Sequence, residues 1–164
     1  MTRTGTRGLA GSTLALALLL PSAVPAAATQ RSLQPAGWDD EIRLSEAVDV
    51  NDDPRIVEII LEARVDTVTI APGVDIDAWT YNGTIPGPLI RARVGDRVIV
   101  HYTNNLPRPS TVHWHGIRVP IEMDGVLGYS QPPVEVGGTF TYDFIVPDAG
   151  TFWYHPHVMS ATQV

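Results

Sequence analysis

The sequence of 164 residues contains no cysteine and no lysine. Without cysteine the chain can form no disulfide bond, and every metal centre that requires a thiolate ligand is excluded. All eleven basic residues are arginine, and 18 acidic residues outnumber them, which gives a formal net charge of −7. This acidic balance argues against nucleic acid and anionic membrane surfaces as partners.

Long hydrophobic runs are also scarce, and the clearest one lies near the N-terminus. Arg3 and Arg7 precede an apolar stretch from Leu14 to Leu20, and the small residues Ala26-Ala27-Ala28 follow it. This order is typical of an export signal, so we expect residues 1–28 to be removed and the protein to be periplasmic or extracellular. The apolar stretch is too short for a membrane span, so none is expected after cleavage, and an uncleaved anchor is the alternative.

After the signal, the pattern predicts one all-β domain. Residues 29–54 are rich in Asp, Glu, Pro and Ala without periodicity, and we interpret them as a lead-in or a loose first strand. Apolar and β-branched residues, or a two-residue alternation, then predict strands over Ile56–Ile70, Val74–Tyr81, Val98–Thr103, Thr111–Ile117 and Phe140–Val146. Short strands without a convincing amphipathic helix indicate a Greek-key sandwich or barrel over residues 55–164.

Histidine is rare, and four of the five histidines form two doublets, His113-Trp114-His115 and His155-Pro156-His157. In a strand, residues two apart point to the same side, so each doublet places both imidazoles on one side. Neutral imidazole is a common ligand of copper, zinc and iron. We predict that the four rings converge on one metal centre; the alternative is that the doublets are ordinary strand residues. We expect His101 to be structural.

The segments around the doublets resemble the first cupredoxin domain of the multicopper oxidases, the laccase-like family. The resemblance runs from about Val74 to the last residue. It is carried, in the family's order, by the segments Tyr81-Asn82-Gly83-Thr84-Ile85-Pro86-Gly87-Pro88, Gly95-Asp96-Arg97-Val98, Thr111-Val112-His113-Trp114-His115-Gly116-Ile117, Met123-Asp124-Gly125, Thr139-Phe140-Thr141-Tyr142-Asp143-Phe144 and Ala149-Gly150-Thr151-Phe152-Trp153-Tyr154-His155-Pro156-His157. It implies a cupredoxin-type β-sandwich or barrel. In the family a further stretch includes the closing strand of this domain, so we expect the present chain to lack its final strand.

The resemblance also implies roles for single residues. His113 matches a ligand of the type 2 copper, His115 and His155 match ligands of one type 3 copper, and His157 matches a ligand of the other. They are four of the eight histidines of a trinuclear copper cluster that reduces dioxygen to water. Asp124 matches an aspartate near the type 2 copper that orients solvent and supplies protons; its alternative is a turn residue.

The missing cysteine limits what this chain can do alone. The blue type 1 copper site, where substrate electrons enter, needs a thiolate, so it cannot form here. The resemblance therefore implies a parent oxidase whose remaining cupredoxin domains supply the other ligands. Its electron donor, a small molecule or a metal ion, stays unidentified. We expect the 164-residue chain alone to be inactive.

Two other functions fit the doublets. One is a non-catalytic copper-binding module, and the other is a mononuclear zinc or iron enzyme on a β-barrel. A cupin is disfavoured because Val119 and Pro120 stand where its glutamate is expected, and a plastocyanin-like electron carrier is excluded by the missing cysteine. Beside the doublets we expect Trp114 to face the core, Gly116 to leave space beside the cluster, and Trp153 and Tyr154 to be packing residues.

Overall fold

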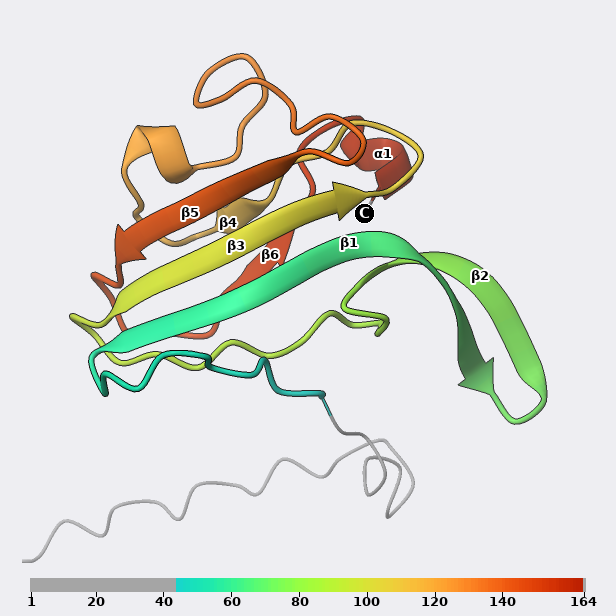
Figure 1. The fold of residues 1–164 in the computed structure, drawn as a ribbon, viewed down its shortest axis with the longest axis horizontal. Coiled ribbons are helices and arrows are strands. Elements are labelled where there is room, and N and C mark those ends of the chain that lie inside the picture. Colours follow the sequence, from blue (N-terminus) through green and yellow to red (C-terminus); the bar gives the residue numbers. More distant parts are fainter. Residues whose placement is uncertain (1–43, 164) are drawn as a thin grey trace, which may run out of the picture. The chain divides into compact units, whose positions relative to one another are not determined.

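The computed structural model describes residues 44–163, so the expected signal and residues 29–43 of the lead-in lie outside the described residues. The chain forms a four-stranded sheet of order β2-β1-β3-β5 and a two-stranded sheet of β4 and β6. The elements are β1 (Ile56–Ala71), β2 (Val74–Tyr81), β3 (Arg97–Asn105), β4 (His113–His115), a 3₁₀ helix (Ile121–Met123), β5 (Thr139–Ile145), β6 (Trp153–His155) and α1 (Ser160–Gln163). The mostly β architecture agrees with the predicted class (Figure 1).

The long strand β1 connects the two halves of the larger sheet. Its second half forms an antiparallel hairpin with β2, and the turn between them contains Gly73 with φ +73°. Its first half runs parallel to β3, with Ile56 opposite Arg97, and β3 pairs antiparallel with β5. The predicted strands over 56–70 and 74–81 are therefore confirmed.

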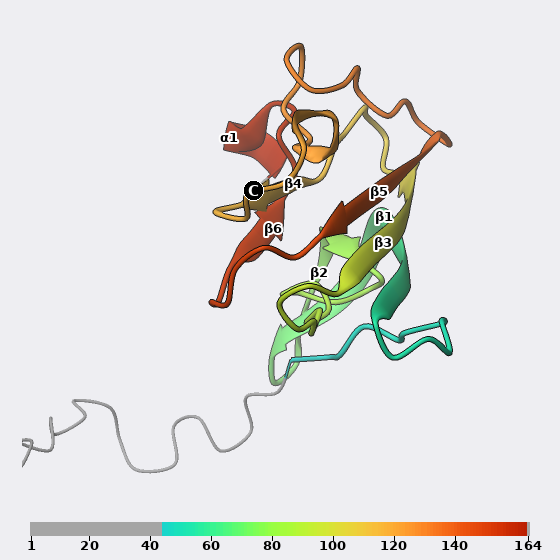
Figure 2. The ribbon, with the colours of Figure 1, turned by 90° about the vertical axis from the view of Figure 1, so that its left-hand side faces the viewer.

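The core lies between the two sheets, which form two layers in Figure 2. Alternate residues of the larger sheet point inward, among them Ile59, Leu61, Val98, Val100, Tyr102, Tyr142 and Phe144. From the smaller sheet Trp114 packs against Tyr142 and Phe144, with ring centroids 5.4 Å and 5.2 Å away. Burial of these aromatic and aliphatic side chains holds the two layers together.

The predicted strand over Thr111–Ile117 is too long. Only His113–His115 is a strand, because Gly116 has φ +87° and turns the chain. Before the strand, the N–H of Val112 donates to the side chain of Tyr142 instead of to a neighbouring strand. Of the expected lead-in, residues 44–54 contain no strand, although Glu46 forms an isolated bridge with Leu89. No helix within residues 44–163 is long and apolar enough to cross a membrane.

The Tyr142 hydroxyl joins the four-stranded sheet to the start of β4. Its oxygen lies 2.8 Å from the backbone nitrogen of Val112, and both residues are fully buried. A buried N–H without an acceptor costs more than an ordinary hydrogen bond gains. This contact therefore helps to hold the backbone from which the first histidine doublet begins.

We expect Tyr142→Phe to lower the free energy of unfolding by about 1–3 kcal/mol, because the Val112 N–H loses its acceptor. Tyr102→Phe is the matched control, since Tyr102 is equally buried and its hydroxyl accepts no backbone N–H among the described residues. The control should be neutral or slightly stabilising. Urea unfolding of both variants measures the difference, and equal losses would contradict the role assigned to the Tyr142 contact.

Candidate metal centre

The register of β4 and β6 decides which side chains share a face. The two strands are antiparallel, with His113 opposite His155, Trp114 opposite Tyr154 and His115 opposite Trp153. Because side chains alternate along a strand, three imidazoles and the Trp153 indole lie on one face. Trp114 and Tyr154 lie on the other face, toward the core, as predicted for Trp114.

The two doublets converge. Nitrogen atoms of His113, His115 and His155 all lie within 4.8 Å of one another, and Nδ1 of His115 is 3.2 Å from Nε2 of His155. The ring of His157 is 5.2 Å from that of His113 and 6.0 Å from that of His155. The two doublets thus lie together as predicted, with the nitrogens of three histidines in one close group and the His157 ring beside it. The role of these residues as metal ligands stays a prediction.

His113 is the central ring of the cluster. Its centroid lies between 5.2 Å and 5.6 Å from each of the other three. Its Nδ1 lies 2.7 Å from the backbone carbonyl oxygen of Asp124. A carbonyl only accepts, so Nδ1 carries the proton and Nε2 keeps a free lone pair. A hydrogen bond of this kind fixes the tautomer of a metal-binding histidine.

His155 is oriented in the same way by its own backbone. Its Nδ1 donates to the carbonyl oxygen of Pro156 at 2.9 Å, which leaves the lone pair of Nε2 facing Nδ1 of His115. Burial lowers the pKa of His155, and the three neighbouring imidazoles lower it further, although the Pro156 hydrogen bond opposes them. His155 therefore favours the neutral form, which is the form that binds metals.

Asp124 lies beside the cluster at the end of the 3₁₀ helix. Its backbone N–H donates to Ile121, and its half-buried carboxylate approaches Nδ1 of His113 to 3.3 Å. The sequence allows two interpretations of Asp124, either as a turn residue or as an aspartate beside the metal centre. The position of Asp124 fits both, because it ends a turn and also adjoins a cluster histidine. The next residue, Gly125, has φ +70° and packs directly against the backbone of Val112.

The sequence also predicted the roles of four residues other than the cluster histidines, namely His101, Gly116, Trp153 and Tyr154, and the outcomes differ. His101 is outside the cluster, as expected, and its Nε2 lies 2.7 Å from a Glu58 carboxylate oxygen. The prediction for Gly116 was wrong, because a Cβ there would meet the Phe152 ring at 3.1 Å and not the histidines. Of the two residues expected to pack beside the second doublet, Tyr154 packs against the core, whereas Trp153 is half exposed and lies against the imidazoles of His115 and His155. The position of Trp153 two residues before His155 could have predicted that it lies on the histidine face, because side chains two apart on a strand lie on the same side.

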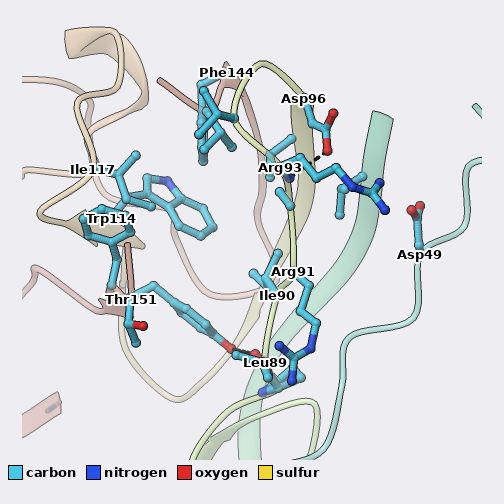
Figure 3. A pocket seen from close by; sticks show the side chains of 18 of the residues that line it. Asp49, Leu89, Ile90, Arg91, Arg93, Asp96, Trp114, Ile117, Phe144 and Thr151 are labelled. Carbon is cyan, nitrogen blue, oxygen red and sulfur yellow. Dashed lines mark hydrogen bonds between the residues drawn. The ribbon is translucent and has the colours of Figure 1, made fainter. Parts of the chain in front are cut away.

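A large cavity is lined by Trp114 and Tyr154 from the reverse face of β4 and β6, and by Trp153 as well. It has a volume of about 1090 Å³, and Figure 3 shows Trp114, Ile117 and Phe144 lining one side of it. None of the four doublet histidines lines this cavity. The four histidines therefore form an open cluster outside this cavity, although Trp153 beside them lines it.

The donor set is chemically suited to a borderline metal ion. It consists of neutral imidazole nitrogens with no thiolate, which suits copper, zinc, nickel or iron. Metal–nitrogen bonds of about 2.0 Å would place two ligand nitrogens about 2.8–4 Å apart. The separation of 3.2 Å between His115 and His155 falls in that range, so one ion fits between them.

Comparison with known proteins points to one family. A family model described as multicopper oxidase matches residues 62–164. Multicopper oxidase MmcO of Mycobacterium tuberculosis is 48% identical over 103 residues, which cover 58% of this chain and 20% of MmcO. Laccase-2 of Botryotinia fuckeliana is 50% identical over 97 residues, covering 57% of this chain and 17% of that protein.

Solved structures agree with these relatives. A multicopper oxidase from Pseudomonas thermotolerans superposes with a TM-score of 0.64 at 47% identity, over 66% of this chain and 26% of that one. A multicopper oxidase from Campylobacter jejuni, described as a metallo-oxidase, gives 0.65 at 32% identity, over 71% and 24%. The chain thus spans about a fifth or less of these two curated relatives and about a quarter of these two structures.

We expect Gly125→Ala to be strongly destabilising and to displace His113. The added Cβ would lie 1.8 Å from the carbonyl oxygen of Val112, so either the Asp124 turn or the start of β4 must move. The loss should exceed about 2 kcal/mol in urea unfolding. The NMR signals of the His113 imidazole nitrogens should also show that the ring no longer keeps the tautomer set by Asp124.

Gly73→Ala is the matched control for this substitution. Gly73 has nearly the same φ, +73°, but nothing lies within 4 Å of its would-be Cβ. Gly73→Ala should therefore lower the free energy of unfolding by only about 1–2 kcal/mol, the cost of an alanine at positive φ, and leave His113 unchanged. If the two alanine variants behaved alike, the close approach at Gly125 would not be what anchors His113.

Proposed function

The chain belongs to the multicopper oxidase family, and on that premise we propose that it is a copper-binding N-terminal cupredoxin domain supplying half of the histidine ligands of a trinuclear cluster. In this proposal His113 binds the type 2 copper, His115 and His155 bind one type 3 copper, and His157 binds the other. The observation that carries it is the approach of His115 Nδ1 to His155 Nε2 at 3.2 Å, across two strands. These are the two residues assigned to one ion.

The chain's own residues prepare this site in three ways. The hydrogen bond from His113 to Asp124 keeps Nε2 of His113 free, and the bond from His155 to Pro156 does the same for Nε2 of His155. The larger sheet holds β4 in place through Tyr142. When bound in a complete enzyme, the copper cluster supplies the four-electron reduction of dioxygen to water.

Asp124 is the candidate for proton handling. Its carboxylate is 3.3 Å from His113 and about a third exposed, so it can accept and release protons in contact with solvent. We propose that it orients solvent at the type 2 copper and supplies protons, as a carboxylate beside a metal-bound water can.

The proposed parent enzyme extends beyond these residues. Its remaining cupredoxin domains would supply the other four histidines and the thiolate of the type 1 site, since this chain has no cysteine. Dioxygen and an electron donor would be its substrates. We further propose that residues 1–28 direct export, that residues 29–54 are a lead-in, and that residues 55–164 belong to the first cupredoxin domain, which takes its final strand from further chain.

We expect the chain to bind Cu(II) more tightly than Zn(II), following the usual affinity order for nitrogen ligands. Binding should weaken as the pH falls below about 6.5, because protons compete for the imidazoles. Combining His113→Ala with His155→Ala should remove copper from the cluster. Isothermal titration with each metal at several pH values measures all three effects.

His101→Ala is the control, because His101 is bound to Glu58 outside the cluster. Unaltered copper stoichiometry in the double variant would place the ligands elsewhere. A preference for a single zinc ion held by His113, His115 and His155, whose nitrogens form a three-ligand group, would instead favour the mononuclear enzyme.

We also expect the copper-loaded chain to show no blue colour and no oxidase turnover by itself. A blue site needs thiolate-to-copper charge transfer, and without it substrate electrons have no entry point. Oxygen consumption with a phenolic donor is the measurement, with free copper as the blank. Sustained reduction of oxygen above that blank, abolished by His157→Ala, would refute this expectation.

A further inference from the structure

Trp153 completes a square of four side chains on the outer face of the two-stranded sheet. It lies opposite His115 across the strands and two residues before His155 along β6. The other corners of the square are all histidines. Trp153 is 51% exposed, whereas Trp114, on the reverse face, is 3% exposed. Burial in the core therefore does not account for a tryptophan at this corner.

The indole of Trp153 lies against two imidazoles at once. Its ring centroid is 4.9 Å from that of His115, with 28° between the planes, and 4.2 Å from that of His155, with 30°. The pair with His115 is stacked, and the pair with His155 is a tilted close contact. The two imidazoles are 5.5 Å apart and inclined by 44° to each other, so the indole contacts both while they face each other.

Of the two histidines that Trp153 contacts, His115 depends more on this contact. His113 is oriented by the Asp124 carbonyl, and His155 by the Pro156 carbonyl. Within residues 44–163, the only hydrogen-bond partner of His115 is His155, and this contact joins the two nitrogens assigned to one copper ion. A metal-binding histidine ordinarily has a second contact that sets its ring orientation. For His115 the structure offers the stacked indole in that place.

We propose that Trp153 is a positioning residue that orients the His115 imidazole, and with it His155, for copper binding. The inference rests on the proposed function. A free imidazole samples several χ1 and χ2 rotamers, and ordering it on binding costs conformational entropy. The stack restricts those rotamers before the metal arrives, so copper binds a site that is already arranged.

The test compares Trp153→Phe with Trp153→Leu in the whole chain. Phenylalanine keeps a ring that can stack, whereas leucine keeps an apolar side chain without one. Cu(II) affinity, measured by competition with a chelator, should fall about tenfold in the leucine variant. It should stay within about threefold of the original protein in the phenylalanine variant. The electron paramagnetic resonance spectrum of bound Cu(II) should change only with leucine.

Two controls separate positioning from a general effect. Tyr129→Ala removes an exposed aromatic side chain outside the cluster and should leave copper affinity unchanged. In a His115→Ala background the leucine substitution should lose most of its effect, because the ring that it positions is gone. Thermal unfolding of the metal-free phenylalanine and leucine variants gives their relative stability without copper.

The proposal fails if the phenylalanine and leucine variants bind copper equally, or if the leucine effect is as large without His115 as with it. Neither result would touch the proposed function, because copper binding by the original chain would remain. A chain that bound no copper in the cluster would instead remove the proposed function, and with it the ground for this inference.

Discussion

The candidate metal centre depends on the register of two strands of three residues each. His113 lies opposite His155 because β4 and β6 pair without a one-residue shift. Since side chains alternate, such a shift in one strand would turn its histidines toward the core and bring Trp114 or Tyr154 to the surface. Three-residue strands contribute few backbone hydrogen bonds, so the register must be held from outside the smaller sheet.

Side chains on the reverse face supply that hold. Trp114 is buried against the aromatic residues of β5, and the Tyr154 hydroxyl donates to the Pro88 carbonyl oxygen at 2.8 Å. An exposed indole or phenol would lose this burial, so a register shift is unfavourable in both strands at once. The alternation of bulky aromatic and histidine residues therefore specifies the fold and the site through one pattern. The core-facing residues fix the position of the solvent-facing ones.

The part of this arrangement that could be predicted from sequence is the local part. Alternation within the first doublet placed its two imidazoles together and Trp114 in the core, and β-branched runs located β1 and β2. The second doublet was expected on a strand as well, but β6 ends at His155 and His157 lies beyond it. The partners of each strand could not be derived from local pattern, because the parallel pairing of β1 with β3 and the contact of Val112 with Tyr142 join distant segments. The same limit explains the error at Gly116, whose neighbour Phe152 comes from the chain just before β6, next to the residue that pairs with His115. Trp153 was within reach of the alternation argument, because it lies two residues before His155 on β6.

The doublets remain intact as pairs of neighbouring imidazoles when the chain is unfolded, because each spans only three residues. An ion that also binds the unfolded chain stabilises the native state less than its native affinity implies. If copper bridged His115 and His155 before folding, it would close a loop between two residues that are 40 apart in sequence. The residues of β5 lie within this loop. Such a loop restricts the unfolded ensemble much as a cross-link does, in a chain that has no cysteine to form one. If the doublets bind copper as proposed, the supply of copper would affect the folding kinetics of this domain as well as its chemistry.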